Sequence, residues 1–244
     1  MELLTYHVSL VFGLISFLTV FTFYKAIQNS KGFAFMALFW LVIQSAVSFS
    51  GFYTFADSLF TRFLMIILPP ALLVIWLFSS QSGKSCLYNV DMHLLTVIHI
   101  VRAPVEVVLY LLFISNVVPQ EMTIAGGNFD ILSGLSAPVI YYWGMMQRKI
   151  KWQLLVVWNV ACLGMLLNVM IRSVLSAPFF FQPIATDQPE VALLHFPFIF
   201  LPGAVLPVIL CSHLAMIRNL VKAYWNEPAQ METGKAYASQ FLAK

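Results

Sequence analysis

Four residues with reactive or charged side chains lie at helical spacing in the middle of the chain. His99, Arg102, Glu106 and Tyr110 are separated by three, four and four positions. Such spacing places side chains on one face of an α-helix. An arginine binds carboxylates and other anions, whereas glutamate and histidine exchange protons. The stripe therefore predicts a site that binds a charged small molecule, moves an ion, or performs acid–base chemistry.

The composition around this stripe is that of a membrane protein. Hydrophobic residues make up 61% of the 244 positions and charged residues 9%, whereas a soluble domain has roughly 45–50% and about 25%. A helix that crosses a bilayer needs about 20 mostly apolar residues. We predict an all-α integral membrane protein, a seven-helix bundle over residues 1–222 followed by a short cytoplasmic tail at 223–244. The expected helices are Tyr6–Ile27, Gly32–Tyr53, Leu59–Ser79, Met92–Ile114, Asp130–Met146, Trp152–Val174 and Ala192–Val221.

The basic residues between these segments predict the orientation of the chain. When the loops are assigned alternately to two sides, ten lysines and arginines fall on one side, and only Arg62 and Arg172 fall on the other. Positive residues collect on the cytoplasmic side of membrane proteins. We therefore expect the N-terminus outside, the C-terminus in the cytoplasm, and the protein in a bacterial inner (plasma) membrane.

The same distribution of charge limits the partners. Basic residues interleaved with exposed aromatics, the pattern of nucleic-acid binding, are absent, so no nucleic acid is expected. The expected partners are the lipid bilayer and a small-molecule or lipid ligand.

Two stretches of the chain resemble each other. Ile67–Leu77 reads ILPPALLVIWL and Phe200–Leu210 reads FLPGAVLPVIL. They fall in the third and seventh predicted helices, which run in the same direction. A duplication of three helices on either side of a linker helix would place them so, as in some transporters. This three-one-three internal repeat is a hypothesis, because apolar helices that contain proline resemble one another by composition.

The charges of the stripe need a specific explanation. The midpoint of Met92–Ile114 lies near Pro104, so Arg102 and Glu106 are expected at the centre of the bilayer. One charge there costs about 2.5–3.5 kcal/mol on insertion scales. We expect the two residues to neutralise each other and the stripe to face the bundle interior. Such a pair either fixes helix packing or forms a site for a ligand, a proton or a substrate, and the second reading is preferred.

Further polar residues are predicted near the outer side. Asn128 or Asp130 is a good N-cap for the fifth helix, and Asn168 and Arg172 lie one turn apart in the sixth. His195 begins the seventh helix. Arg172 has Asp130, Asp187 and Glu190 as potential acidic partners. We assign Asp130, Asn168, Arg172 and His195, together with the stripe, to a ligand site open to the outside.

Cofactors are constrained only weakly. His99 and His213 lie at similar predicted depth, about two turns from the inner ends of their helices, so they are candidates for binding haem or a metal ion. No HExxH motif is present, and metal binding is not the preferred interpretation. The seventh helix has no lysine that would form a retinal Schiff base.

Three functions remain open. The preferred one is a membrane protein that binds or moves a small molecule or ion through the buried polar site. The first alternative is an intramembrane enzyme acting on a lipid or isoprenoid, with Glu106, Asp130 or a histidine as acid or base. The second is a structural or haem-binding membrane subunit, whose charges specify packing.

Overall fold

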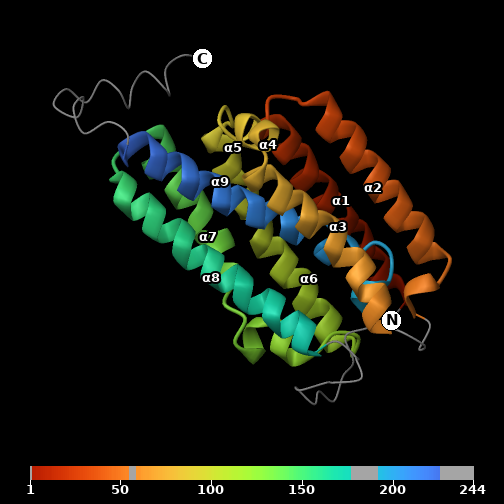
Figure 1. The fold of residues 1–244 in the computed structure, drawn as a ribbon. Helices are drawn as coiled ribbons and strands as arrows, with labels where there is room; N and C mark the ends of the chain where they lie inside the picture. The colour runs from red at the N-terminus through yellow and green to blue at the C-terminus, as the bar shows by residue number, and fades with distance from the viewer. Residues whose placement is uncertain (1, 55–58, 177–191, 226–244) are drawn as a thin grey trace.

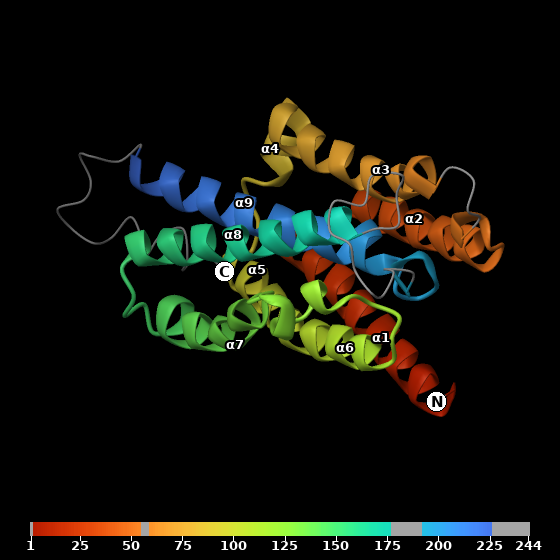
Figure 2. The same ribbon diagram turned by 90° about the horizontal axis from the view of Figure 1, so that it is seen from below.

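The computed structural model describes residues 2–54, 59–176 and 192–225, and all the regular structure in these ranges is helical. Six helical segments in these ranges are long and apolar enough to cross a membrane, which supports the prediction of a membrane protein. Figures 1 and 2 show them side by side in one bundle. The main helices are α1 (Glu2–Ala26), α2 (Lys31–Phe49), α3 (Leu59–Ser79), α5 (Met92–Ile98), α6 (Arg102–Ile114), α7 (Ile131–Val139), α8 (Trp152–Ser176) and α9 (Leu206–Trp225).

Short helical segments connect or extend these helices. The six-residue helix α4 (Gln81–Cys86) links α3 to α5. Single tight turns follow α2, α6 and the long connection after α8: η1 (Phe52–Thr54), η3 (Gln120–Met122), η4 (Ile124–Gly126) and η6 (Ala192–Leu194). Two further segments, η2 (His99–Val101) and η7 (Leu201–Val205), are irregular turns inside longer helices, and η5 (Ile140–Met146) continues α7 to its end.

Prolines account for those irregular turns. The fourth predicted span is one continuous rod in which the tighter turn η2 joins α5 to α6, just before Pro104. Pro104 has no N–H to donate to Ile100, four residues earlier, and its ring crowds that carbonyl. Pro138 and Pro202 lie beside or inside the wider π-helical turns η5 and η7, as expected where a regular hydrogen bond is missing.

The last span begins later than the sequence analysis expects. The predicted helix Ala192–Val221 is divided in the structure into η6, a turn region, η7 and α9. Pro197 and Pro202 interrupt helical hydrogen bonding in its first third. The membrane-capable part accordingly runs from Leu201 to Ala223.

The fifth predicted span, Asp130–Met146, is shorter than a complete crossing. α7 and η5 hold 9 and 7 residues, which is at most about 24 Å of helix, against a hydrocarbon thickness of about 30 Å. α7 is short because its first turn already lies inside the bundle. Asp130, the residue before it, pairs with Arg102, which also contacts Cys162 near the middle of α8.

The loops rich in lysine and arginine gather at one end of the bundle. The Gln28 side chain after α1 donates to the carbonyl of Asn89, and the backbone N–H of Asp91 donates to Ala26. Arg218 of α9 donates to the carbonyl of Lys84 in α4. Figure 1 places the N-terminus at the opposite end of the bundle from the last turn of α9.

The two stretches proposed as a repeat lie next to each other but differ in local structure. Residues 67–77 belong to the uninterrupted helix α3, which contains Pro69 and Pro70. Residues 200–210 comprise the π-helical turn η7 and the start of α9. The internal repeat stays a prediction.

Candidate functional site

Arg102 is the centre of a buried polar cluster formed by α6, α7, α8 and α9. Its side chain is 1% exposed. The Nε atom donates to Asp130 Oδ2 at 2.8 Å, and Nη2 forms an ion pair with the other oxygen of the same carboxylate. Nη2 also donates to the carbonyl of Cys162 at 3.1 Å, and Nη1 lies 2.9 Å from His213 Nε2. Every nitrogen of the guanidinium therefore has a partner from another segment.

Two histidines lie face to face beside this arginine. The rings of His99 and His213 stack with their centroids 3.8 Å apart and a 13° angle between planes. Nδ1 of His213 lies 2.9 Å from Asn159 Oδ1, and the Asn159 amide donates to the carbonyl of Leu155. Trp158 meets both histidine rings edge-on. Since Arg102 only donates, His213 accepts at Nε2 and carries its proton at Nδ1.

Glu106 is bound to a different segment. Its carboxylate is 4% exposed, and Oε1 accepts a hydrogen bond of 2.7 Å from the Asn128 amide. The same amide donates to the carbonyl of Met122, and its oxygen accepts from the backbone N–H of Asp130. Among the described residues, Glu106 Oε2 and both ring nitrogens of His99 have no hydrogen-bond partner. The cluster thus contains a fully bonded arginine and two buried proton-exchanging groups with unused polar atoms.

The cluster depends on a loop that turns back into the bundle after α6. Asn128 reaches Glu106, which lies eight residues before the end of α6, or about 12 Å along its axis. Irregular backbone at membrane depth is tolerated only where protein buries it or where it lines a watery cavity. Here buried polar side chains of the bundle bond to it.

Close glycine contacts hold this loop and α7 in place. A Cβ on Gly134 of α7 would overlap the backbone nitrogen of Ala103, and a Cβ on Gly126 would overlap Gln120 and Glu121. Gly127 has a φ of 91°, which favours glycine. Arg172 of α8 donates to the carbonyl of Gly126 at 2.7 Å. Backbone contact at Gly134 brings α7 against the first turn of α6, where Asp130 meets Arg102.

The predicted pairing of Arg102 with Glu106 is wrong, because each residue bonds to a different partner. His99, Arg102 and Glu106 are buried as predicted. Arg102, however, pairs with Asp130 and Glu106 with Asn128, not with each other. The carboxylate of Asp130 engages two nitrogens of the guanidinium fork, a geometry that provides strong, directional hydrogen bonds.

The remaining predicted site residues lie outside the cluster. Tyr110 is 45% exposed and its ring contacts Phe113, so that end of the stripe is not buried by the described residues. His195 is exposed after η6. Asn168 and Arg172 bond to each other at 3.1 Å and to the backbone of Gly126 and Gly127, so they support the loop from behind. Arg172 does not take Asp130 as its partner; Asp187 and Glu190 lie outside the described residues, as does most of the predicted tail.

The N-cap expectation is met only by position. Asp130 occupies the N-cap of α7, yet its side chain makes no capping hydrogen bond. The carboxylate is committed to Arg102, and Asn128 accepts the backbone N–H of Asp130 instead. The Asp130 carboxylate therefore forms a buried ion pair in place of a capping hydrogen bond.

The histidine geometry bears on the haem and metal hypotheses. The stacked rings of His99 and His213 are in van der Waals contact, so a porphyrin does not fit between them as they stand. Within the described ranges, no three His, Cys, Asp or Glu side chains are grouped to hold a metal ion. Both hypotheses stay predictions that this arrangement does not favour.

Sequence reasoning missed Asn128, Asn159 and Cys162 as partners, and it singled out His213 as a candidate ligand of haem or a metal ion and not as a partner of Arg102. Gly126 and Gly127, just before Asn128, were the available signal, because a paired glycine allows close approach of the backbone. Asn159 lies one turn beyond Leu155, whose carbonyl it contacts, and carries no comparable signal in the sequence.

Comparison with known proteins places the chain in a family without assigning a function. No curated protein and no solved structure matches it. Residues 58–221 match a family model described as a domain of unknown function, DUF8737. The matched region covers about two thirds of the 244 residues, from the start of α3 to the last turns of α9. The chain therefore belongs to the DUF8737 family.

Proposed function

We propose that this protein is a membrane carrier of ions, in which the buried cluster around Arg102 takes up and releases a proton. The observation that carries the proposal is the Glu106 carboxylate. It is buried at the middle of a membrane span, yet one of its oxygens has no partner among the described residues. Intramembrane carboxylates of this kind commonly belong to ion or proton pathways.

The bonding of Arg102 separates a fixed part of the cluster from a reactive part. Networks that only specify packing bond all their buried polar atoms. Every guanidinium nitrogen of Arg102 and both ring nitrogens of His213 have a partner, and Asp130 Oδ1, which accepts no hydrogen bond, forms an ion pair with Arg102. Glu106 Oε2 and both ring nitrogens of His99 have no hydrogen-bond partner among the described residues, and each of these residues lies about one helical turn from Arg102.

The backbone around the cluster supports the same reading. η2 and Pro104 interrupt the helix between His99 and Glu106, and the loop before α7 enters the bundle beside them. Broken helices and re-entrant segments at mid-membrane are the usual surroundings of transport sites. We propose access from the outer side, because this loop starts at the predicted outer end of α6.

The proposed topology is a seven-helix bundle with an outer N-terminus in a bacterial inner membrane. In it, the re-entrant loop and α7 together complete the fifth crossing. The ten-to-two distribution of basic residues supports the orientation.

Cys86 provides a test of that orientation. It is partly exposed in α4, whereas Cys162 and Cys211 are buried. A membrane-impermeant maleimide should label Cys86 in inverted vesicles but not in intact cells. Burial raises the pKa of the Cys86 thiol, so less thiolate is present at neutral pH and labelling should be faster at mildly alkaline pH. Labelling in intact cells would reverse the proposed orientation.

Proton movement tests the function itself. Purified protein in liposomes that contain a pH-sensitive dye should admit protons when a potassium gradient and valinomycin set a negative interior. Glu106→Gln should abolish this flux, because the amide cannot exchange the proton. Tyr110→Phe, on the exposed end of the same helix face, should leave it unchanged.

A second measurement covers a carrier that moves protons only with its substrate. Infrared difference spectra between neutral and acidic pH should contain a carboxylic acid band that Glu106→Gln removes. If the wild-type protein shows neither flux nor this band, the proposal is wrong.

The enzyme alternative has less support. The apolar groove between α2, α3 and α9, described below, is lined in the described residues by apolar side chains and one cysteine, without a carboxylate or histidine. A lipid bound there would meet no general acid or base.

A further inference from the structure

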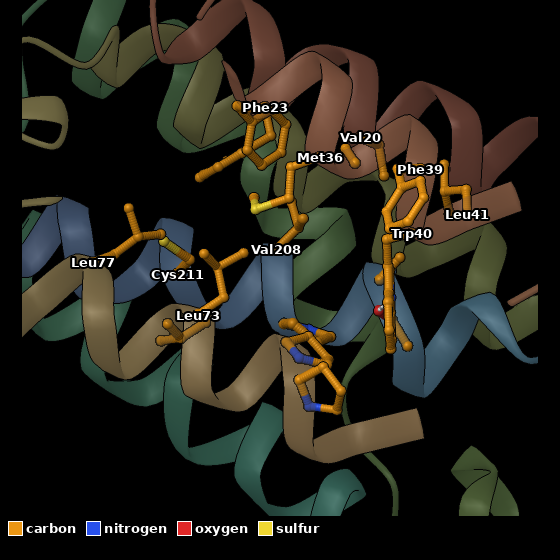
Figure 3. Close-up of a pocket in the computed structure, with 18 residues that line it drawn as sticks. Val20, Phe23, Met36, Phe39, Trp40, Leu41, Leu73, Leu77, Val208 and Cys211 are labelled. Carbon is orange, nitrogen blue, oxygen red and sulfur yellow. Dashed lines mark hydrogen bonds between the residues drawn. The ribbon is translucent and has the colours of Figure 1, made fainter. Parts of the chain in front are cut away.

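A second feature of the molecule lies on the other side of α9. Figure 3 shows Met36, Phe39 and Trp40 of α2 facing Leu73 of α3 and Val208 of α9 across an apolar groove. The groove has a volume of about 180 Å³. Its walls come from α1, α2, α3, η7 and α9, and Phe39 on its rim is 58% exposed. It is therefore a surface groove that opens toward lipid.

The groove exists because α2 is attached to the bundle mainly through its second half. Trp40 donates from Nε1 to the carbonyl of Gly203 at 2.8 Å, and Ser48 donates to the carbonyl of Leu194. Gly203 has this carbonyl available because Pro207, four residues later, has no N–H. The buried residues of α2, Gln44 and Ser48, both lie in its second half, and in the first half the Phe33 ring contacts Phe23 of α1.

The groove is long and narrow along the helix axes. On α3 its lining runs from Pro69 to Leu77, and on the last span from Gly203 to Cys211. Eight residues of helix measure about 12 Å. An apolar groove of this shape, parallel to the membrane normal, fits an extended hydrocarbon chain better than a compact ligand.

The two ends of the groove differ in the charged residues that lie near them. The deep end, at Trp40 and Pro69, is at mid-helix. The other end, at Phe33 and Leu77, lies beside the basic loops. Lys31 is two residues before Phe33 and is exposed. Lys84 follows Gly83, whose backbone packs so closely on Leu77 that a Cβ would overlap it. Two cations thus flank the end where a lipid headgroup would lie.

We propose that this groove holds one acyl chain of an anionic membrane lipid, with the lipid phosphate beside Lys31 and Lys84. Lysines next to a membrane surface each contribute about 1 kcal/mol to the attraction of anionic lipid. The chain would fill the space between α2 and α3 and hold α2 against the bundle. This inference concerns residues outside the Arg102 cluster and does not depend on proton transport.

Native mass spectrometry of the detergent-purified protein tests the acyl-chain part. Dioleoyl phosphatidylglycerol is titrated into the wild type and two variants of α3. Leu73→Trp fills the groove and should weaken binding of the first lipid at least tenfold. Leu72→Trp is the matched control, since Leu72 is 54% exposed on the same helix and does not line the groove; binding should be unchanged. Equal binding by all three proteins would overturn the proposal.

The headgroup part is tested with dioleoyl phosphatidylcholine in the same titration. The wild type should prefer phosphatidylglycerol severalfold, and the double variant Lys31→Gln/Lys84→Gln should lose the preference. Lys149→Gln/Lys151→Gln, two exposed lysines before α8, should retain it. A preference that survives the first pair would place the anionic headgroup elsewhere and contradict the assignment.

A photoreactive lipid keeps the test independent of folding defects. Phosphatidylglycerol with a diazirine in one chain should crosslink, in the wild-type protein, to peptides that contain Trp40, Leu73 or Cys211. Crosslinks confined to the exposed faces of α1 and α8 would exclude the groove. Failure of these experiments would leave the proton-flux result untouched, so the two proposals can be separated.

Discussion

The two faces of α9 border regions with opposite physical character. His213 faces the cluster, where Arg102, Asp130 and the asparagines are joined by short hydrogen bonds. Val208 and Cys211 face the groove, where apolar side chains leave about 180 Å³ unfilled. In a membrane, apolar surface gains little from contact with more apolar surface, because lipid is equally apolar. Hydrogen bonds and close backbone contacts therefore determine which half of this bundle is tightly packed.

The polar half of the bundle is held by more specific contacts than the apolar half. The half formed by α6–α9 has an ion pair, a stacked histidine pair and the backbone contact at Gly134. The half formed by α1–α3 depends on a few bonds such as Trp40 to Gly203. The family match begins at residue 58, so it includes the whole cluster but excludes α1 and α2.

Asp130→Ala is expected to have the largest effect. It leaves Arg102 charged, 1% exposed and without its carboxylate. Breaking a buried ion pair by removing one partner costs about 3–5 kcal/mol. The melting temperature in detergent should fall steeply, and the yield of folded protein with it.

The double variant Arg102→Leu/Asp130→Ala tests whether the loss of stability comes from an unpaired buried charge. It removes both charges, so it should recover part of the lost stability although it has one more substitution. If Asp130→Ala melts like the wild type, the ion pair is not what holds α7 to α6.

The substitutions Gly134→Ala and Gly164→Ala place a methyl group at a tightly packed position and at an open position, respectively. A methyl at Gly134 would overlap the Ala103 backbone nitrogen and lie 2.9 Å from the Ala103 Cβ, whereas nothing lies within 4 Å at Gly164. Overpacking costs about 1–3 kcal/mol, and alanine in place of a mid-helix glycine gains about 0.5–1 kcal/mol. The two substitutions should therefore shift the melting temperature in opposite directions.

The proton flux separates this effect from simple destabilisation. Gly134→Ala moves Asp130 away from Arg102 and should reduce the flux even at temperatures where the variant is folded. A Gly134→Ala protein with unchanged melting temperature and flux would show that α7 can shift without disturbing the cluster.

The fold was largely predictable, whereas the partners within the site were not. Apolar length alone locates six of the seven predicted spans among the described residues, and the cost of burying charge places His99, Arg102 and Glu106 inside. Asp130 was expected on the outer side because it begins an apolar segment. In the structure, the loop before it bends inward, a tertiary effect of the Gly126 and Gly134 contacts that periodicity does not encode. Hydrogen-bond partners 28 or 111 residues apart leave no pattern in a single sequence.

Trp40→Phe is expected to have the smallest effect on stability. It removes the indole N–H that bonds the Gly203 carbonyl and keeps an aromatic ring on the groove. Interhelical hydrogen bonds in membranes contribute about 0.6–1.7 kcal/mol, so the melting temperature should drop slightly. Trp76→Phe, at an exposed position of α3, is the control and should cause no drop.

The same variant tests whether the two halves work independently. Because Gly203 and His213 lie on different turns and faces of the last span, loss of the Trp40 bond should weaken lipid retention in the groove and leave proton flux at the wild-type level. Equal loss of flux and lipid binding would mean that α9 transmits a change from the groove to the cluster. Lipid binding in the groove and proton flux at Glu106 would then be coupled through α9, and the contact of α2 with Gly203 would affect the buried glutamate from the opposite face of that helix.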